Sequence, residues 1–338
     1  MSRKYNVVVV GVGAVGEEMM RVIRQRRFPV NRLTVLARSA REIKVDGVSY
    51  AVKAAAPEEF EGAHFAFFAG TEGEKGAAVT FYPEAKKRGA VSIDNGADFR
   101  LDPKVPLVVP EVNPEDIAKH SGIIANPNCS TIQMVVALAP LHRAARIKRV
   151  IVATYQAVSG TGREAIAELK NQVPRFLAGE KEFACEAYPY RIAFNLIPQI
   201  GTFEKLDFTT EEWKMDRETK KILHDDSIQV SATTIRVPVF NVHSEAIYIE
   251  TEKPLSVEKA RMLLAAAPGV VLMDDPAKKL YPMPITADGR DEVFVGRIRK
   301  DPYAGNGLHL WVVADNIRKG AASNVVQIAE RMIADGLV

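Results

Sequence analysis

The sequence has little that would mark a secreted, membrane or nucleic-acid-binding protein. Its 338 residues include two cysteines, Cys129 and Cys185, too few for a disulfide framework or a cysteine-rich zinc site, so we expect no metal. No apolar run reaches the roughly 20 residues that span a bilayer, and the N-terminus carries no signal-peptide pattern. The net charge of +3 is too small and too evenly spread to imply a nucleic-acid or membrane partner, but it is compatible with a small anionic substrate. We expect a cytoplasmic protein with no nucleic-acid or membrane partner.

The length of the chain predicts two domains, and the order of its patterns indicates their types. Through the first hundred residues short β-branched runs alternate with helical patterns, which favours a doubly wound parallel α/β sheet. We expect strands at 5–10, 33–37, 65–69 and 91–94, and helices at 15–26 and 76–88. From about Arg149 the strands lengthen and fewer helices separate them, which favours a second domain with a mixed or antiparallel sheet. A helical pattern at 320–333 is predicted to return to the first domain.

Three glycines, Gly11, Gly13 and Gly16, form a G-x-G-x-x-G pattern between the run VVVV and an amphipathic helix. With Ala14 and Val15 at the helix start, exposed amides and the helix dipole can hold a pyrophosphate. The same pattern also occurs in a tight turn that binds nothing. Its position between strand and helix favours a dinucleotide site.

The end of the second expected strand favours NADP over NAD. NAD enzymes usually place an acidic residue about 20 residues beyond the glycines, for the ribose 2′-hydroxyl. This chain has Arg38, Ser39 and Arg41 there. Arginine makes paired, charge-assisted hydrogen bonds with phosphate, so these residues suit a 2′-phosphate. A solvated charged loop is the alternative.

Cys129 is the candidate nucleophile. It follows Asn126-Pro127-Asn128, and an apolar helix is predicted to begin at or just after it. A helix N-terminus lowers the pKa of a thiol, and its amides can stabilise an oxyanion. Taken alone, a cysteine is more often a small buried residue, and we assign Cys185 to packing because its surroundings offer nothing comparable.

Four motifs in order resemble the aspartate-β-semialdehyde dehydrogenase family. They are NPNCST at 126–131, TYQAVSGTG at 154–162, RVPVFNVHSEA at 236–246 and DNIRKGAASNVVQIAE at 315–330. The resemblance implies a Rossmann-type NADP-binding domain at 1–127 plus 317–338 and an α/β catalytic and dimerisation domain at 128–316. It implies NADPH-dependent conversion of L-aspartyl 4-phosphate to L-aspartate 4-semialdehyde and phosphate, for lysine, threonine, methionine and diaminopimelate biosynthesis. It also implies a homodimer, or a tetramer built from dimers.

The resemblance further implies a role for individual residues. Cys129 matches the nucleophile that forms an acyl thioester, Gln156 orients the substrate, and His243 is the general acid and base. The remaining matches are Arg236 for the substrate carboxylate, Glu211 for its amino group, Arg100, Lys214 and Asn128 for phosphate, and Ser159, Gly160 and Asn316 for the cofactor. Without the resemblance, the stretch 211–221 reads as a solvated charged helix.

The seven-residue separation of Arg236 and His243 sets a geometric condition. It would put the two side chains on opposite faces of an ideal strand, so we expect a bend at Pro238 or beyond. The sequence departs from the family in its glycine loop, which is one residue shorter and lacks a threonine, and in the loop 69–77.

Other functions fit the motifs less well. N-acetyl-γ-glutamyl-phosphate reductases carry a glycine before the cysteine and an aromatic after it, and glyceraldehyde-3-phosphate dehydrogenases carry Ser-Cys-Thr-Thr-Asn. This chain has Asn128-Cys129-Ser130-Thr131. A non-catalytic NADP-binding paralogue would be expected to lose the thiol or the histidine, and both are present.

Overall fold

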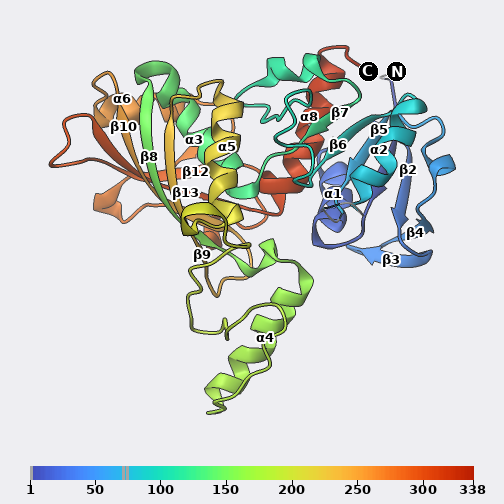
Figure 1. The fold of residues 1–338 in the computed structure, drawn as a ribbon, viewed down its shortest axis with the longest axis horizontal. Helices are drawn as coiled ribbons and strands as arrows, with labels where there is room; N and C mark the ends of the chain where they lie inside the picture. The colour runs from blue at the N-terminus through green and yellow to red at the C-terminus, as the bar shows by residue number, and fades with distance from the viewer. Residues whose placement is uncertain (1–2, 71–72, 74–75) are drawn as a thin grey trace. The chain divides into compact units, whose positions relative to one another are not determined.

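The computed structural model describes residues 3–70, 73 and 76–338, which divide into two compact units (Figure 1). Unit 1 comprises Met1–Asn128 and Ala321–Val338, and unit 2 comprises Cys129–Gly320. Part of the unusual loop 69–77 lies outside the described residues. None of the helices in the described ranges combines the length and apolar character needed to cross a membrane.

Unit 1 is built on a seven-stranded sheet in the order β3-β4-β2-β1-β5-β6-β7. Its strands are β1 (Tyr5–Val10), β2 (Val30–Ala37), β3 (Arg41–Val45), β4 (Val48–Ala54), β5 (Phe65–Phe68), β6 (Val91–Asp94) and β7 (Ile123–Ala125). All neighbours are parallel except β3 and β4, so the predicted doubly wound parallel sheet is confirmed, with an antiparallel hairpin added at one edge. Asp46 and Gly47 both have positive φ and make the tight turn of this hairpin, an Asp-Gly signal that the sequence analysis missed.

Helices cover both faces of this sheet. They are α1 (Ala14–Gln25), α2 (Ala77–Lys87) and α8 (Ser323–Ala334), with short 3-10 turns η1 (Pro57–Phe60) and η2 (Pro114–Lys119). Phe65 and Phe67 pack under α1 and α8, while Phe68 packs toward α2 on the other face. Burial on both faces explains the continuous apolar runs that predicted these strands. The helix expected at 320–333 begins only at Ser323, because 318–322 form a π-helical turn, η6 (Arg318–Ala322).

Unit 2 contains a six-stranded mixed sheet in the order β11-β12-β13-β10-β8-β9, as predicted for the second domain. Its strands are β8 (Ile147–Gln156), β9 (Gln229–Arg236), β10 (His243–Thr251), β11 (Val270–Leu272), β12 (Val293–Lys300) and β13 (Gly307–Ala314). Its helices are α3 (Cys129–Ala145), α4 (Arg163–Leu177), α5 (Thr210–Leu223), α6 (Val257–Ala265) and α7 (Pro284–Ala287), with 3-10 turns η3 (Val158–Gly160), η4 (Lys205–Asp207) and η5 (Pro276–Lys278). Strand β10 runs antiparallel to both β8 and β13, whereas β8 and β9 are parallel.

Helices α3 and α5 pack against each other and against the strands of this sheet. Most residues of α3 are buried, as its largely apolar sequence predicts. The solvated interpretation of 211–221 is wrong, because α5 buries the side chains of Glu211, Glu212 and Glu218. Glu212 forms a capping box with Thr209, and its carboxylate also accepts the Thr234 amide at 3.0 Å, so burial leaves it well paired.

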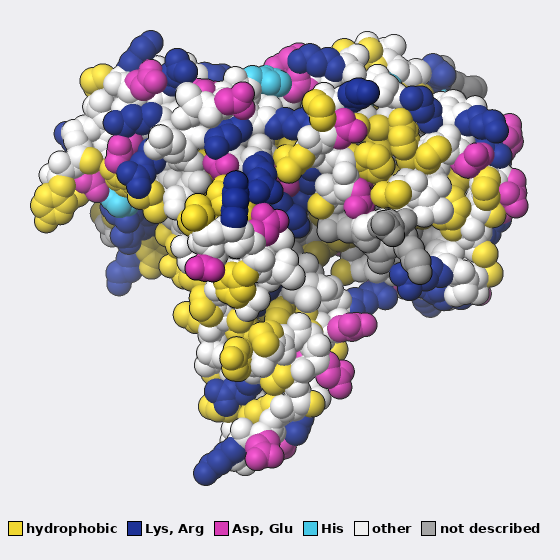
Figure 2. All heavy atoms as spheres, in the orientation of Figure 1, with side chains coloured by type: hydrophobic (Ala, Val, Ile, Leu, Met, Phe, Trp, Pro, Cys, Tyr) yellow, Lys and Arg dark blue, Asp and Glu magenta, His cyan; other side chains and the backbone are white. Residues whose placement is uncertain are grey.

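The α4 segment of unit 2 has a small core of its own. Tyr188, Ile192 and Ile197 from the chain after α4 pack against Val158 and Leu169. Leu177 remains 72% exposed, and Tyr190, Phe194 and Leu196 are exposed as well. Figure 2 shows hydrophobic side chains along this segment, which Figure 1 labels α4.

Candidate active site

Three strand ends in unit 2 carry the predicted substrate and acid–base residues. Gln156 ends β8 and Arg236 ends β9, and these two residues are paired in the parallel register. His243 begins β10, whose second residue, Ser244, stands opposite Tyr155 of β8. The chain reverses between β9 and β10, which confirms the bend expected near Pro238 and places all three residues at one end of the sheet.

Gly160 shows that Arg236 and His243 face the same small space. A Cβ atom at this glycine would lie 3.0 Å from Arg236 Nη1 and 3.3 Å from His243 Nε2. A side chain there would push against both groups, so the position suits glycine. Arg236 donates from Nη1 to the Ala157 carbonyl at 2.6 Å, and its Nε has no hydrogen-bond partner in the described part of the chain. The guanidinium is therefore anchored on one side and available for a carboxylate on the other.

His243 is fully buried, and its protonation is set by the backbone. Its Nδ1 accepts a hydrogen bond from the Ala157 N–H at 3.0 Å. Burial, and then the nearby Arg236 charge, hold its pKa well below the usual 6.5. A neutral ring whose Nδ1 accepts must carry its proton on Nε2, and Nε2 has no partner within the described residues. The structure thus presents a neutral imidazole with Nε2–H on the side of Gly160.

Asn316 holds the segment that precedes His243. Its Nδ2 donates to Ser159 Oγ at 3.0 Å, and its Oδ1 accepts the Val242 N–H at 2.9 Å. Val242 has φ of 78°, a strained conformation for a buried β-branched residue. The motif that the sequence analysis assigned to cofactor binding therefore also positions His243.

Cys129 is the first residue of α3 and is partly buried. A Cβ atom at Gly320 would lie 2.7 Å from the Cys129 Cβ and 3.6 Å from the Asn316 Cβ. Only glycine lets the turn η6 pass this close to the thiol. Gly320 thus lies next to both Cys129 and Asn316, and Asn316 is hydrogen-bonded to Ser159, the residue before Gly160.

Gln156 is fixed by two neighbours, which orient its amide. It donates from Nε2 to Glu211 Oε1 at 3.2 Å and accepts from Thr154 Oγ1 at 3.0 Å. Lys214 lies one helical turn after Glu211 and 3.6 Å from its carboxylate. Gln156, Glu211 and Lys214 thus form one connected polar group, and Gln156 lies in register beside Arg236.

The remaining predicted phosphate residues belong to unit 1. Arg100 is buried, and its Nη2 donates to the Asn95 carbonyl at 2.9 Å. Asn126 donates to Asn95 Oδ1 at 2.9 Å and accepts from Asn324 of α8 at 2.7 Å. This asparagine network, which the sequence analysis did not identify, holds the segment that ends in the buried Asn128.

The predicted nucleotide loop is also in unit 1, and its glycines have distinct steric reasons. Gly11 has φ of +108°, and a Cβ at Gly16 would lie only 2.0 Å from the Gly11 carbonyl oxygen. Gly13 precedes α1, with Ala14 and Val15 in the first turn, and no side chain caps this helix start. Arg38, Ser39 and Arg41 are exposed, and Arg41 Nη1 donates to Ser39 Oγ at 3.3 Å. The loop thus fits a pyrophosphate, and the exposed cations fit a further phosphate.

Two other features contain none of the predicted site residues. Cys185 is partly buried, with its Sγ 3.6 Å from the Phe183 carbonyl, as expected for a packing role.

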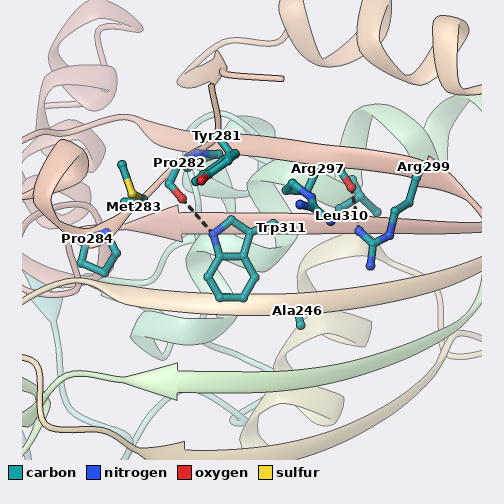
Figure 3. Close-up of a pocket in the computed structure, with 9 residues that line it drawn as sticks. All are labelled: Ala246, Tyr281, Pro282, Met283, Pro284, Arg297, Arg299, Leu310 and Trp311. Atoms are coloured by element: carbon teal, nitrogen blue, oxygen red, sulfur yellow. Dashed lines mark hydrogen bonds between the residues drawn. The ribbon is translucent and has the colours of Figure 1, made fainter. Parts of the chain in front are cut away.

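A cavity of about 320 Å³ opens beside β12 and β13 (Figure 3). It is lined by Ala246, Tyr281, Pro282, Met283, Pro284, Arg297, Arg299, Leu310 and Trp311, and Trp311 Nε1 donates to the Pro282 carbonyl at 3.0 Å. None of these nine residues is a nucleophile of the predicted kind.

Comparisons with known proteins cover the chain from end to end. The family model "Semialdehyde dehydrogenase, NAD binding domain" matches residues 6–120, and "Semialdehyde dehydrogenase, dimerisation domain" matches residues 138–319. The chain is 53% identical to an aspartate-semialdehyde dehydrogenase of Aquifex aeolicus over 99% of both chains, and 50% identical to one of Bacillus subtilis over 98% of both. It resembles the crystal structure of aspartate semialdehyde dehydrogenase II from Vibrio cholerae complexed with ASA, with a TM-score of 0.93 and 43% identity over 99% of both chains.

Proposed function

Because this chain belongs to the aspartate-semialdehyde dehydrogenase family, we propose that it converts L-aspartyl 4-phosphate to L-aspartate 4-semialdehyde and phosphate with NADPH. It is then an oxidoreductase of amino-acid biosynthesis that acts on an aldehyde group. The convergence of Arg236 and His243 on Gly160 is the observation of this structure that best supports the proposal. It provides a carboxylate-binding cation beside an uncharged acid–base group.

Substrate binding is assigned to the polar group at the strand ends. Arg236 binds the α-carboxylate, with its Nε and the adjacent Nη forming a bidentate pair. Glu211 accepts the substrate ammonium, and Gln156, held between Thr154 and Glu211, orients the reacting end. Arg100, Lys214 and Asn128 bind the phosphate group and offset its charge.

The bond-making steps take place on Cys129. Its thiolate, favoured by the start of α3, attacks the acyl carbon, a C–S bond forms, and the C–O bond to phosphate breaks. When NADPH is bound, it supplies the hydride that reduces the thioester. Collapse of the resulting thiohemiacetal breaks the C–S bond, and the aldehyde and the free thiolate are released.

His243 is assigned the proton handling at the carbonyl oxygen. With Nδ1 accepting from Ala157, the neutral ring can donate a hydrogen bond from Nε2–H to this oxygen as negative charge develops on it, and the proton stays on Nε2 because its full transfer would leave an imidazolate. To accept the thiol proton at Nε2, the ring would first have to lose that hydrogen or exchange tautomers. The observed hydrogen bond therefore favours the donor role of His243 over the base role.

NADP is assigned to unit 1. The glycine loop and the open start of α1 bind the pyrophosphate, and Arg38, Ser39 and Arg41 bind the 2′-phosphate. Ser159, Gly160 and Asn316 are proposed to approach the nicotinamide end, in addition to the positioning contacts described above. Preference for NADPH over NADH in a binding titration is the expected result.

The assembly is proposed to be a homodimer. Residues 138–319 match a dimerisation domain, and the α4 segment exposes apolar side chains that a partner would cover. A tetramer built from dimers and a cytoplasmic location remain predictions.

The decisive experiment is phosphate-dependent reduction of NADP with aspartate semialdehyde. We expect turnover that requires phosphate and is absent from Cys129→Ser. Wild-type protein that binds NADPH but shows no turnover in either direction would overturn the proposed activity.

A further inference from the structure

Glu245 is a fully buried carboxyl group of unit 2 that the proposed reaction does not use. Neither of its oxygens has a hydrogen-bond partner within the described residues. Burial raises its pKa well above the usual 4.5, and the Gln133 amide acts against this rise. An ionised carboxylate without a cation is strongly disfavoured in such a place, so burial favours the neutral acid form of Glu245.

Glu245 lies next to the proposed site residues in the sheet of unit 2. It follows His243 by two residues on β10, so both side chains lie on the same face of the sheet. In register, Glu245 stands between Thr154 of β8 and Val312 of β13. Thr154 donates a hydrogen bond to Gln156, so a neighbour of Glu245 in the sheet also orients a predicted substrate-binding residue.

Gln133 brings the nucleophile's helix to the same place. It lies four residues after Cys129 on α3, one turn along the same helix face. Its two amide atoms are buried, and neither meets hydrogen-bond geometry within the described residues. A neutral acid and an amide are complementary, because the acid O–H donates to the amide oxygen while the amide N–H donates to the acid carbonyl. Ionisation of the acid removes one of these two bonds.

We propose that Glu245 is a positioning residue: as the neutral acid it pairs with Gln133 and fixes the start of α3, with Cys129, against the strand that carries His243. Two titratable residues lie on the elements that carry this pair: His243, two residues before Glu245 on β10, and Cys129, one turn before Gln133 on α3. The adjacent strands present Thr154 and Val312, which do not titrate. A negative charge on Glu245 would oppose formation of a thiolate at the start of this helix.

The protonation state can be tested without measuring activity. Infrared difference spectra between wild type and Glu245→Gln at neutral pH should show a carboxylic-acid C=O stretching band that the variant lacks. Glu245→Gln is the matched control because its amide keeps the size and neutrality of the acid. A difference spectrum with only carboxylate bands would overturn the proposal.

The positioning role is tested by the reactivity of Cys129 toward iodoacetamide and by kcat. Glu245→Gln should stay within about threefold of wild type, whereas Glu245→Leu should lose about tenfold or more in both, with KM for NADPH unchanged. If Glu245→Leu does not fold, Gln133→Leu carries the same expectation. Wild-type reactivity in the leucine variants would refute the role.

A double variant separates positioning from packing. Gln133→Leu with Glu245→Leu removes both polar groups, so thermal stability should recover relative to either single variant. Alkylation of Cys129 and kcat should stay low, because the pairing that sets the helix position is gone. Recovery of reactivity together with stability would show that Glu245 serves only packing.

Discussion

The nucleotide loop of unit 1 takes its glycines from the run 11–16, whereas the site of unit 2 draws side chains from α3, α5, three strand ends and the segment before the turn η6. The loop is specified by local backbone geometry, as the positive φ of Gly11 and the contact at Gly16 show. The site depends instead on burial, which sets the protonation of His243 and Glu245. Substitutions in the nucleotide loop or at Arg38 should therefore change cofactor affinity, and substitutions at Cys129 or His243 should change the chemistry.

The largest effect is expected at the nucleophile. Cys129→Ser should lower kcat by more than about a thousandfold, because the alkoxide is far harder to form than the thiolate. NADPH affinity, measured by fluorescence titration, should stay within about twofold because unit 1 is untouched. Cys185→Ser is the control and should retain wild-type kcat. Equal losses in both cysteine variants would break the distinction between a reactive thiol and a packing thiol.

The next largest effect tests the tautomer of His243. His243→Asn should lower kcat by about 100- to 10,000-fold, the usual contribution of an acid–base group. The amide nitrogen of glutamine reaches the position of Nε2, so His243→Gln should retain about tenfold more activity than His243→Asn. Steady-state kinetics of both variants decide this point. Equal, complete loss would show that proton acceptance, rather than donation, is the essential role.

A smaller effect is expected in unit 1. Arg38→Ala should weaken NADPH binding by about tenfold, the loss of one charge-assisted pair, and leave NADH binding unchanged. Saturating NADPH should restore nearly wild-type kcat. Arg32→Ala, which removes an exposed arginine from the same strand before its end, is the matched control. A variant with unchanged NADPH affinity would favour the solvated-loop interpretation of Arg38.

The smallest effect is a change in how stability depends on pH. Glu245 holds its proton in the folded state above pH 4.5, whereas the unfolded state releases it, so the free energy of unfolding falls as pH rises from 4.5 toward the folded pKa. Glu245→Gln has no titrating group at this position, so it lacks this pH-dependent loss of stability. Its melting temperature should exceed that of wild type by a margin that grows with pH. The expected growth is about 2 °C for each pH unit between 4.5 and the folded-state pKa of Glu245. A constant margin from pH 5 to pH 8 would contradict the assigned protonation.

Much of the fold could be predicted because its signals are local. The runs 5–10 and 91–94 became strands with those bounds, and α3 begins at Cys129 as its apolar pattern indicated. The hairpin β3–β4 was missed because its strands are polar and partly exposed, although Asp46-Gly47 gave a turn signal. The stretch 211–221 was misread as solvated in one interpretation, because buried glutamates look like surface residues until their partners are known.

The glycines and the order of the four motifs were enough by themselves to identify the cofactor class and the family and to propose Cys129 as the nucleophile, because each is a pattern of neighbouring residues. Only the tertiary structure decided that Arg236 and His243 share one space at Gly160, that Asn316 restrains Val242, and that His243 presents Nε2–H. It alone showed that Glu245 is fully buried. Burial and hydrogen-bond partners come from residues distant in sequence, and these set the charge of a side chain.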